Sequence, residues 1–115
     1  MNFKNFELII FDLDGTLVDS AKDIMIANNK TLEKFGYKPI SFKNVKHIIG
    51  QGIRVNITRS LKIQNVKVSK IKENEMYNYF FSFYKKNLYI KSKIYTGLNS
   101  FLKKLKKRNY KLAVC

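Results

Sequence analysis

Two aspartates lie two positions apart at the end of a short apolar run, in the segment Phe11-Asp12-Leu13-Asp14-Gly15-Thr16-Leu17-Val18-Asp19-Ser20. The run over residues 6–11 is continuous except for Glu7, which is typical of a strand buried in a parallel sheet. All four aspartates of the chain lie between positions 12 and 23 of an otherwise basic sequence. Acids gathered in this way indicate a cation site or carboxylate chemistry rather than scattered surface charge.

The rest of the chain is mostly helical in pattern. We expect Ser20 to cap a helix that runs to about residue 35, with Asp23 in the reciprocal position of a capping box. Apolar spacing predicts further helices over about residues 41–49, 53–61, 70–88 and 98–108, and a second apolar strand over 110–115. In the helix over 70–88, Tyr77, Phe81, Tyr84 and Leu88 repeat at helical spacing, and Phe80 and Phe83 widen the predicted buried stripe.

This order of elements favours one fold class. Two strands joined by a long helical crossover form a parallel pair, so we predict an α/β, Rossmann-like sheet with helices inserted between its first two strands. Ligands of such sheets bind at the carboxyl ends of the strands. Asp12 and Asp14 follow the carboxyl end of the first predicted strand, so their placement agrees with their chemistry.

Composition limits the possibilities further. With 115 residues, 45% of them hydrophobic, the chain can bury a modest core, and it contains no apolar run long enough to span a membrane. A single cysteine, Cys115, excludes an internal disulfide, and we expect a cytoplasmic protein. The net charge of +15 comes almost entirely from lysine. Nucleic-acid binders use arginine heavily, so we attribute this charge to biased composition and expect neither a nucleic-acid nor a membrane partner.

The aspartate-rich segment resembles motif I of the haloacid dehalogenase superfamily, in the D-x-D-G-T form found in its phosphatases. Further segments resemble one branch of this superfamily, the phosphoglycolate phosphatase-like hydrolases, which carry a small helical cap. These segments are Ser20-Ala21-Lys22-Asp23-Ile24, Ile49-Gly50-Gln51-Gly52, Phe83-Tyr84-Lys85-Lys86-Asn87-Leu88, Tyr95-Thr96-Gly97-Leu98 and Tyr110-Lys111-Leu112-Ala113-Val114. This resemblance implies that residues 1–16 and 90–115 belong to the α/β hydrolase core and that residues 17–89 form the cap. It also implies a small phosphorylated metabolite as substrate, with 2-phosphoglycolate expected first and pyrophosphate or a sugar phosphate as alternatives.

The chemistry follows from the residues themselves. Asp12 can attack phosphorus in line and form an aspartyl-phosphate, while Asp14 can protonate the leaving oxygen and later accept a proton from water. Two carboxylates repel a phosphate dianion, so a divalent cation is needed, and Mg²⁺ suits oxygen ligands. The resemblance implies that the Asp12 carboxylate and the Asp14 main-chain carbonyl bind this ion. Gly15 permits a tight turn against phosphate, and Thr16 supports the loop.

Other interpretations of the motifs carry less weight. A calcium loop of the EF-hand type needs glycine at its sixth position, where this chain has Leu17. Gly50-Gln51-Gly52 is too short for a dinucleotide fingerprint and indicates a hinge between cap helices. Because this part of the family's cap faces the active site, Gln51 and Arg54 could contact the substrate's non-reacting end. His47 has no second ligand-type partner nearby in the sequence.

The family also uses a Ser or Thr after the second strand, a later Lys and a late acidic pair, and the sequence stops at Cys115 before any of these. We therefore expect the front part of a longer hydrolase, inactive as a 115-residue chain alone. Two alternatives remain open, a non-catalytic remnant and a basic nucleic-acid-binding module.

Overall fold

The computed structural model describes residues 6–115, which fall into two compact units. One unit, called here the sheet unit, combines the described residues up to Ser20 with Ser92–Cys115. The other, the helical unit, is Ala21–Lys91. The first five residues of the predicted core segment 1–16 lie outside the described residues. The helical unit therefore begins and ends a few residues after the bounds 17–89 predicted for the cap.

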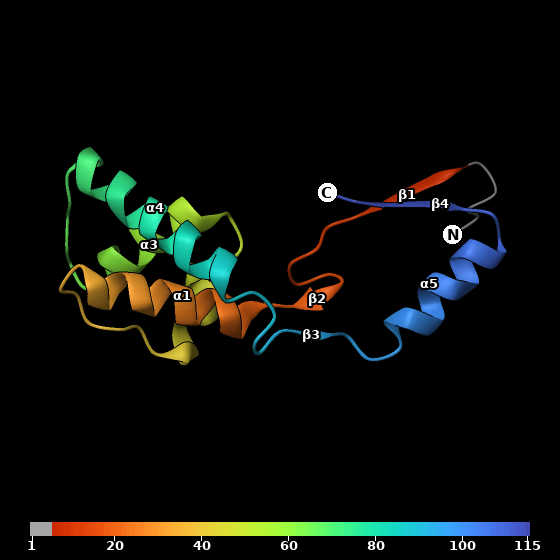
Figure 1. Ribbon diagram of the computed structural model, residues 1–115, viewed down its shortest axis with the longest axis horizontal. Helices are drawn as coiled ribbons and strands as arrows, with labels where there is room; N and C mark the ends of the chain where they lie inside the picture. Colours follow the sequence, from red (N-terminus) through yellow and green to blue (C-terminus); the bar gives the residue numbers. More distant parts are fainter. Residues whose placement is uncertain (1–5) are drawn as a thin grey trace. The chain divides into compact units, whose positions relative to one another are not determined.

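The sheet unit is built on a parallel pair of strands. Strand β1 (Leu8–Phe11) pairs with β4 (Lys111–Val114), with Leu8 opposite Lys111 and Phe11 opposite Val114. Helix α5 (Leu98–Lys107) precedes β4, as Figure 1 shows. The α/β class and the parallel pairing of the first and last predicted strands are confirmed. The first strand begins at Leu8, two residues later than the apolar run predicts.

A second, antiparallel pair in the sheet unit was not predicted. Strand β2 (Val18–Asp19) pairs with β3 (Lys93–Ile94), so that Val18 lies opposite Ile94 and Asp19 opposite Lys93. Two-residue strands contain too few positions to show an alternating pattern, and their partner is distant in sequence. The pair fixes the path of the chain at the two places where it enters and leaves the helical unit.

The helical unit contains α1 (Ala21–Lys34), the 3₁₀ turn η1 (Phe42–Asn44), α2 (Val45–Ile48), α3 (Ile53–Ile63) and α4 (Lys70–Lys86). Its helices follow the predicted ones with shifts of a few residues at their ends. Ser41 caps η1 by accepting from the Lys43 N–H at 3.4 Å, so the single helix predicted over 41–49 is a 3₁₀ turn followed by a short α-helix. Ser69 caps α4 by accepting from the Lys72 N–H at 3.2 Å.

The core of the helical unit is packed where α1, α3 and α4 meet. Its largest fully buried apolar side chains are Leu32, Ile48, Ile57, Met76 and Phe80. On α4 the buried positions are therefore Met76 and Phe80, one helical turn apart. The predicted stripe contains Phe80 but is too wide, because its members Phe81 and Leu88 are 50% and 44% exposed. An aromatic-rich helix fits several stripes, and only its neighbours decide which one is buried.

The sheet of the first unit is far less enclosed than the helical core. Leu8 and Ile10 of β1 are 50% and 58% exposed, so the prediction of a fully buried strand is wrong for the described residues. A hollow of about 350 Å³ lies between α5 and the strands, lined among others by Phe11, Leu102 and Leu112. Two strands and one helix leave much of a sheet face uncovered.

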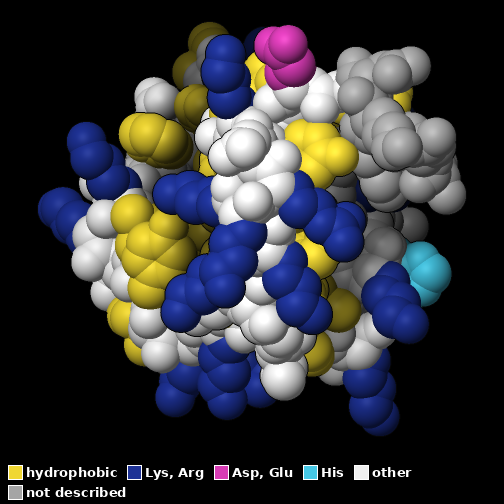
Figure 2. Space-filling model, turned by 90° about the vertical axis from the view of Figure 1, so that its right-hand side faces the viewer, with side chains coloured by type: hydrophobic (Ala, Val, Ile, Leu, Met, Phe, Trp, Pro, Cys, Tyr) yellow, Lys and Arg dark blue, Asp and Glu magenta, His cyan; other side chains and the backbone are white. Residues whose placement is uncertain are grey.

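Helix α5 carries a concentrated positive charge. Its outer side and the residue after it present exposed Lys103, Lys104, Lys106, Lys107 and Arg108. Figure 2 shows this side of the molecule, where lysine and arginine side chains spread over much of the surface with hydrophobic side chains between them. Cations in the last turn of a helix interact favourably with its negative end. Within residues 6–115, no helix has the length and apolar character needed to cross a membrane.

Candidate functional site

The candidate site is the loop that leaves the carboxyl end of β1. Asp12 follows the strand directly, and Asp14 follows two residues later, with both side chains exposed. Gly15 adopts φ +78°, a left-handed conformation that glycine reaches without strain. The Gly15 N–H donates to the Val18 carbonyl at 2.8 Å, and this bond closes the loop. The two carboxylates are therefore held on a short, internally bonded turn at the edge of the sheet where ligands of α/β folds bind.

One carbonyl organises the interior of this turn. The Leu13 carbonyl oxygen accepts from the N–H groups of Leu17 and Val18, both at 3.0 Å, and from that of Thr16 at 3.3 Å. The Thr16 hydroxyl makes a long contact of 3.5 Å to Asp12 Oδ2. Thr16 therefore supports the turn and touches the first carboxylate.

Asp14 has a close partner in Ser20. The Ser20 hydroxyl donates to Asp14 Oδ1 at 2.5 Å, and Ser20 itself is only 3% exposed. The sequence pattern predicts Ser20 as a helix cap and gives no sign of its contact with Asp14. A spacing of six residues is not a recognised contact spacing in a strand or helix, so only the folded turn brings these side chains together.

The carboxyl end of β4 lies beside the same loop. The Cys115 N–H donates to the Phe11 carbonyl at 3.0 Å, which places the end of β4 next to the residue before Asp12. The described residues contain no group of three or more Asp, Glu, His or Cys side chains able to hold a metal ion. An exposed carboxylate and a main-chain carbonyl are oxygen donors of the kind that Mg²⁺ accepts together with several waters, so Asp12 and Asp14 fit this ion as a partial ligand set.

Gln51 and Arg54, the predicted substrate contacts, belong to the helical unit, whereas Asp12 and Asp14 belong to the sheet unit. Gln51 Oε1 accepts from Arg59 Nη2 at 2.7 Å. Arg54 Nη1 donates to Asn74 Oδ1 at 2.7 Å, and its guanidinium lies 4.1 Å from the centre of the Tyr77 ring. Both side chains are thus engaged with neighbours in their own unit.

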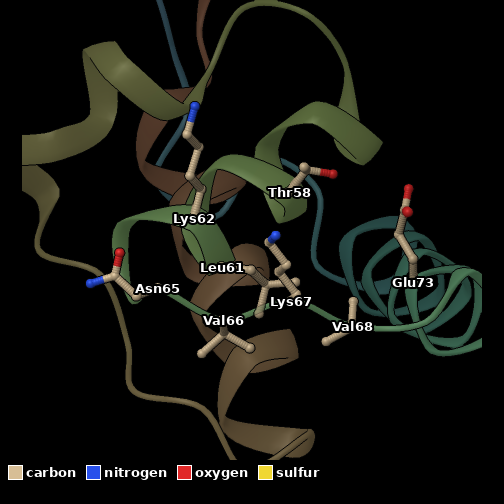
Figure 3. Close-up of a pocket in the computed structure, with 8 residues that line it drawn as sticks. All are labelled: Thr58, Leu61, Lys62, Asn65, Val66, Lys67, Val68 and Glu73. Atoms are coloured by element: carbon tan, nitrogen blue, oxygen red, sulfur yellow. The ribbon is translucent and has the colours of Figure 1, made fainter.

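The helical unit also contains a hollow of about 570 Å³, shown in Figure 3. Leu61, Val66 and Val68 contribute apolar side chains, and Lys62 and Lys67 extend from its border. Its one acid, Glu73, accepts from Lys70 Nζ at 3.2 Å, and its one hydroxyl, that of Thr58, donates to the Arg54 carbonyl at 2.9 Å. The one acid and the one hydroxyl of this hollow are already paired, so it offers less for carboxylate or nucleophile chemistry than the aspartate loop.

Comparison with known proteins gives one consistent result. Residues 9–115 match the model of a family described as haloacid dehalogenase-like hydrolase. The phosphoglycolate phosphatase of Agrobacterium fabrum is 34% identical over 94% of this chain, and that of Aquifex aeolicus is 39% identical over 93%. A crystal structure of a predicted phosphoglycolate phosphatase from Haemophilus somnus 129PT aligns over 95% of this chain, with a TM-score of 0.83 and 32% identity.

The match covers nearly all of this chain but only part of each relative. The chain spans about half the length of the curated relatives it matches, 46% of the Agrobacterium protein and 47% of the Aquifex protein. It likewise covers 50% of the Haemophilus chain. The family match over residues 9–115 includes the aspartate loop, the helical unit, β4 and all of β1 except Leu8.

Proposed function

Because the chain belongs to the haloacid dehalogenase-like hydrolases, we propose that Asp12 and Asp14 carry out the hydrolysis of a small phosphate monoester. The observation that carries this proposal is the position of two exposed carboxylates on one bonded turn at the carboxyl end of β1. Phosphoryl transfer depends chiefly on positioning and electrostatics, and a rigid turn next to a parallel sheet provides positioning.

The two carboxylates have different roles, Asp12 as the nucleophile and Asp14 as the general acid and base. A carboxylate oxygen of Asp12 attacks the phosphorus, the ester P–O bond breaks, and Asp14 gives its proton to the departing alcohol oxygen. The aspartyl-phosphate on Asp12 is then hydrolysed by water, whose proton passes to Asp14 as the phosphate leaves. Asp14 ends the cycle protonated, ready for the next ester, and Asp12 is regenerated as a carboxylate.

The loop supplies the remaining contacts. The Asp12 carboxylate and the Asp14 main-chain carbonyl would hold Mg²⁺, which when bound neutralises the charge of the carboxylates and the phosphate dianion. Gly15 leaves its backbone open, since an added Cβ there would have no atom within 4 Å, so phosphate can approach closely. Thr16 keeps the turn in shape through its contact with Asp12.

The substrate class comes from the relatives. Two of them are named phosphoglycolate phosphatase, so we propose 2-phosphoglycolate, acted on in the cytoplasm, as the first substrate to test. The helical unit would act as the cap, with Gln51 and Arg54 reaching the substrate's non-reacting end. Both would first have to leave Arg59 and Asn74, their present partners.

The proposed nucleophile can be tested on this chain without requiring turnover of an ester. Acetyl phosphate is a mixed anhydride with a good leaving group, so transfer to Asp12 demands less help than hydrolysis of an ester does. With acetyl phosphate and Mg²⁺, intact mass spectrometry should show the addition of one phosphoryl group, and peptide mapping should place it on Asp12. Asp12→Asn should abolish the addition. Asp19→Asn, which changes another exposed aspartate of the same segment, should not.

Label that persists in Asp12→Asn, or that disappears equally in Asp19→Asn, would refute the assignment of the nucleophile. Release of phosphate from 2-phosphoglycolate by the same chain measures the complete reaction. We propose that this release is very slow for the 115 residues alone, because the described residues contain no group of three or more Asp, Glu, His or Cys side chains that would complete a metal site.

A further inference from the structure

The hydrogen bond between Ser20 and Asp14 is short, and its donor is buried. Its donor is almost completely buried, with 3% of the residue exposed, while its acceptor carboxylate belongs to an exposed residue. The distance of 2.5 Å from Ser20 Oγ to Asp14 Oδ1 lies at the short end for an O–H donor bound to a carboxylate. Such charge-assisted bonds are about twice as strong as bonds between neutral groups.

The surrounding backbone fixes both ends of this bond. On one side, the turn that carries Asp14 is closed by the Gly15 N–H to the Val18 carbonyl at 2.8 Å. On the other side, Ser20 follows β2 directly, and β2 is paired with β3. Ser20 is also buried while Asp14 is exposed, so the serine hydroxyl has less room to turn than the carboxylate that it orients.

We propose that Ser20 is a positioning residue for Asp14, an inference that rests on the proposed function. The hydroxyl occupies Oδ1, which leaves Oδ2 as the oxygen that gives and accepts the proton. It also fixes the torsion of the Asp14 side chain, so that the free oxygen points the same way in both halves of the reaction. Without Ser20, the carboxylate rotates among several orientations, and only a fraction of them serve proton transfer.

The half-reaction that depends on Asp14 as a base gives the sharpest test. The chain is phosphorylated with acetyl phosphate and Mg²⁺, the reagent is removed, and the lifetime of the phosphoryl group on Asp12 is followed by intact mass. General bases contribute about 10²–10⁴-fold, so loss of orientation in Ser20→Ala should lengthen the lifetime by a smaller factor, about tenfold. Asp14→Asn should lengthen it further. Ser20→Thr, which keeps the hydroxyl, should restore it to within about twofold of the wild type.

Two controls separate positioning from general damage. Ser100→Ala removes an exposed serine hydroxyl from the same unit and should leave the lifetime unchanged. The Asp14 carboxyl carbon, observed by NMR in the unphosphorylated chain at fixed pH, should shift in Ser20→Ala and stay in place in Ser100→Ala. A merely structural serine would alter the unfolding temperature without moving this resonance.

The outcomes also separate the two proposals. Absence of any label on Asp12 in the wild type would overturn the proposed function and, with it, the role given to Ser20. Normal labelling, with a lifetime in Ser20→Ala equal to the wild type while Asp14→Asn lengthens it, would overturn only the inference about Ser20. A lengthened lifetime that Ser20→Thr does not restore would overturn it as well.

Discussion

The Asp23 carboxylate, in the first turn of α1, accepts the backbone N–H of Lys91, which lies 68 positions further along the chain. The two oxygens lie 2.8 and 3.1 Å from that nitrogen, and Asp23 is 4% exposed. This contact joins the last residue of the helical unit to its first helix, so the two ends of the unit are held together.

Replacing Asp23 should destabilise the helical unit. Asp23→Ala removes a buried acceptor and leaves the Lys91 N–H without this partner, which should cost about 1.5–3 kcal/mol, the range for hydrogen bonds to charged groups. Urea unfolding followed by circular dichroism measures the loss of helix. Asp19→Asn, an exposed aspartate, should change the free energy of unfolding by less than about 0.5 kcal/mol. Equal effects of the two variants would contradict the role of the Asp23 contact.

Two adjacent phenylalanines of α4 should differ sharply in their contribution to stability. Phe80 is fully buried, so Phe80→Ala should cost about 3–5 kcal/mol through lost burial and the cavity it leaves. Phe81 is 50% exposed, so Phe81→Ala should cost about 1 kcal/mol or less. Chemical denaturation of both variants measures this difference, which the stripe predicted from the sequence, containing both residues, does not give.

Asn28 and Ser60, which form a hydrogen bond inside the helical core, should contribute to the free energy of unfolding in a coupled way. Asn28 Nδ2 donates to Ser60 Oγ at 2.9 Å, both residues are fully buried, and Ser60 Oγ donates in turn to the Asn56 carbonyl at 2.8 Å. Ser60→Ala should cost about 1–3 kcal/mol because it leaves the Asn28 amide without this acceptor. In a double-mutant cycle, Asn28→Ala should cost less in the Ser60→Ala background than in the wild type. Additive free energies would show that the two side chains act independently.

Gly15 should be sensitive to substitution for a backbone reason alone. An added Cβ would meet no atom within 4 Å, yet φ is +78°, so Gly15→Ala should cost about 1–2 kcal/mol of strain. Gly15→Asn should cost less, since asparagine tolerates this conformation better. Thermal unfolding and Asp12 phosphorylation of the two variants check this order. An alanine variant as stable as the asparagine variant would show that strain at this position is not the determinant.

Much of the fold could be predicted from local patterns. The parallel pair follows from two apolar runs at opposite ends of the chain, and the helices follow from apolar spacing, because these signals lie within a few residues of one another. The unpredicted elements depend on distant partners. Strand β2 exists because β3 lies beside it, and the burial of Phe80 rather than Phe81 depends on α1 and α3 packing against α4.

The features of the candidate site also separate into those predictable from nearby residues and those that depend on the folded structure. The amino-acid order alone determined that Asp12 and Asp14 follow a strand and precede a glycine turn, because residues this close in the chain cannot be far apart in space. Only the tertiary structure decided that Ser20 holds Asp14 and that Asp23 holds Lys91. Both bonds join side chains or backbone groups that no helix or strand period brings together, so they exist only once the turn and the helical unit have folded.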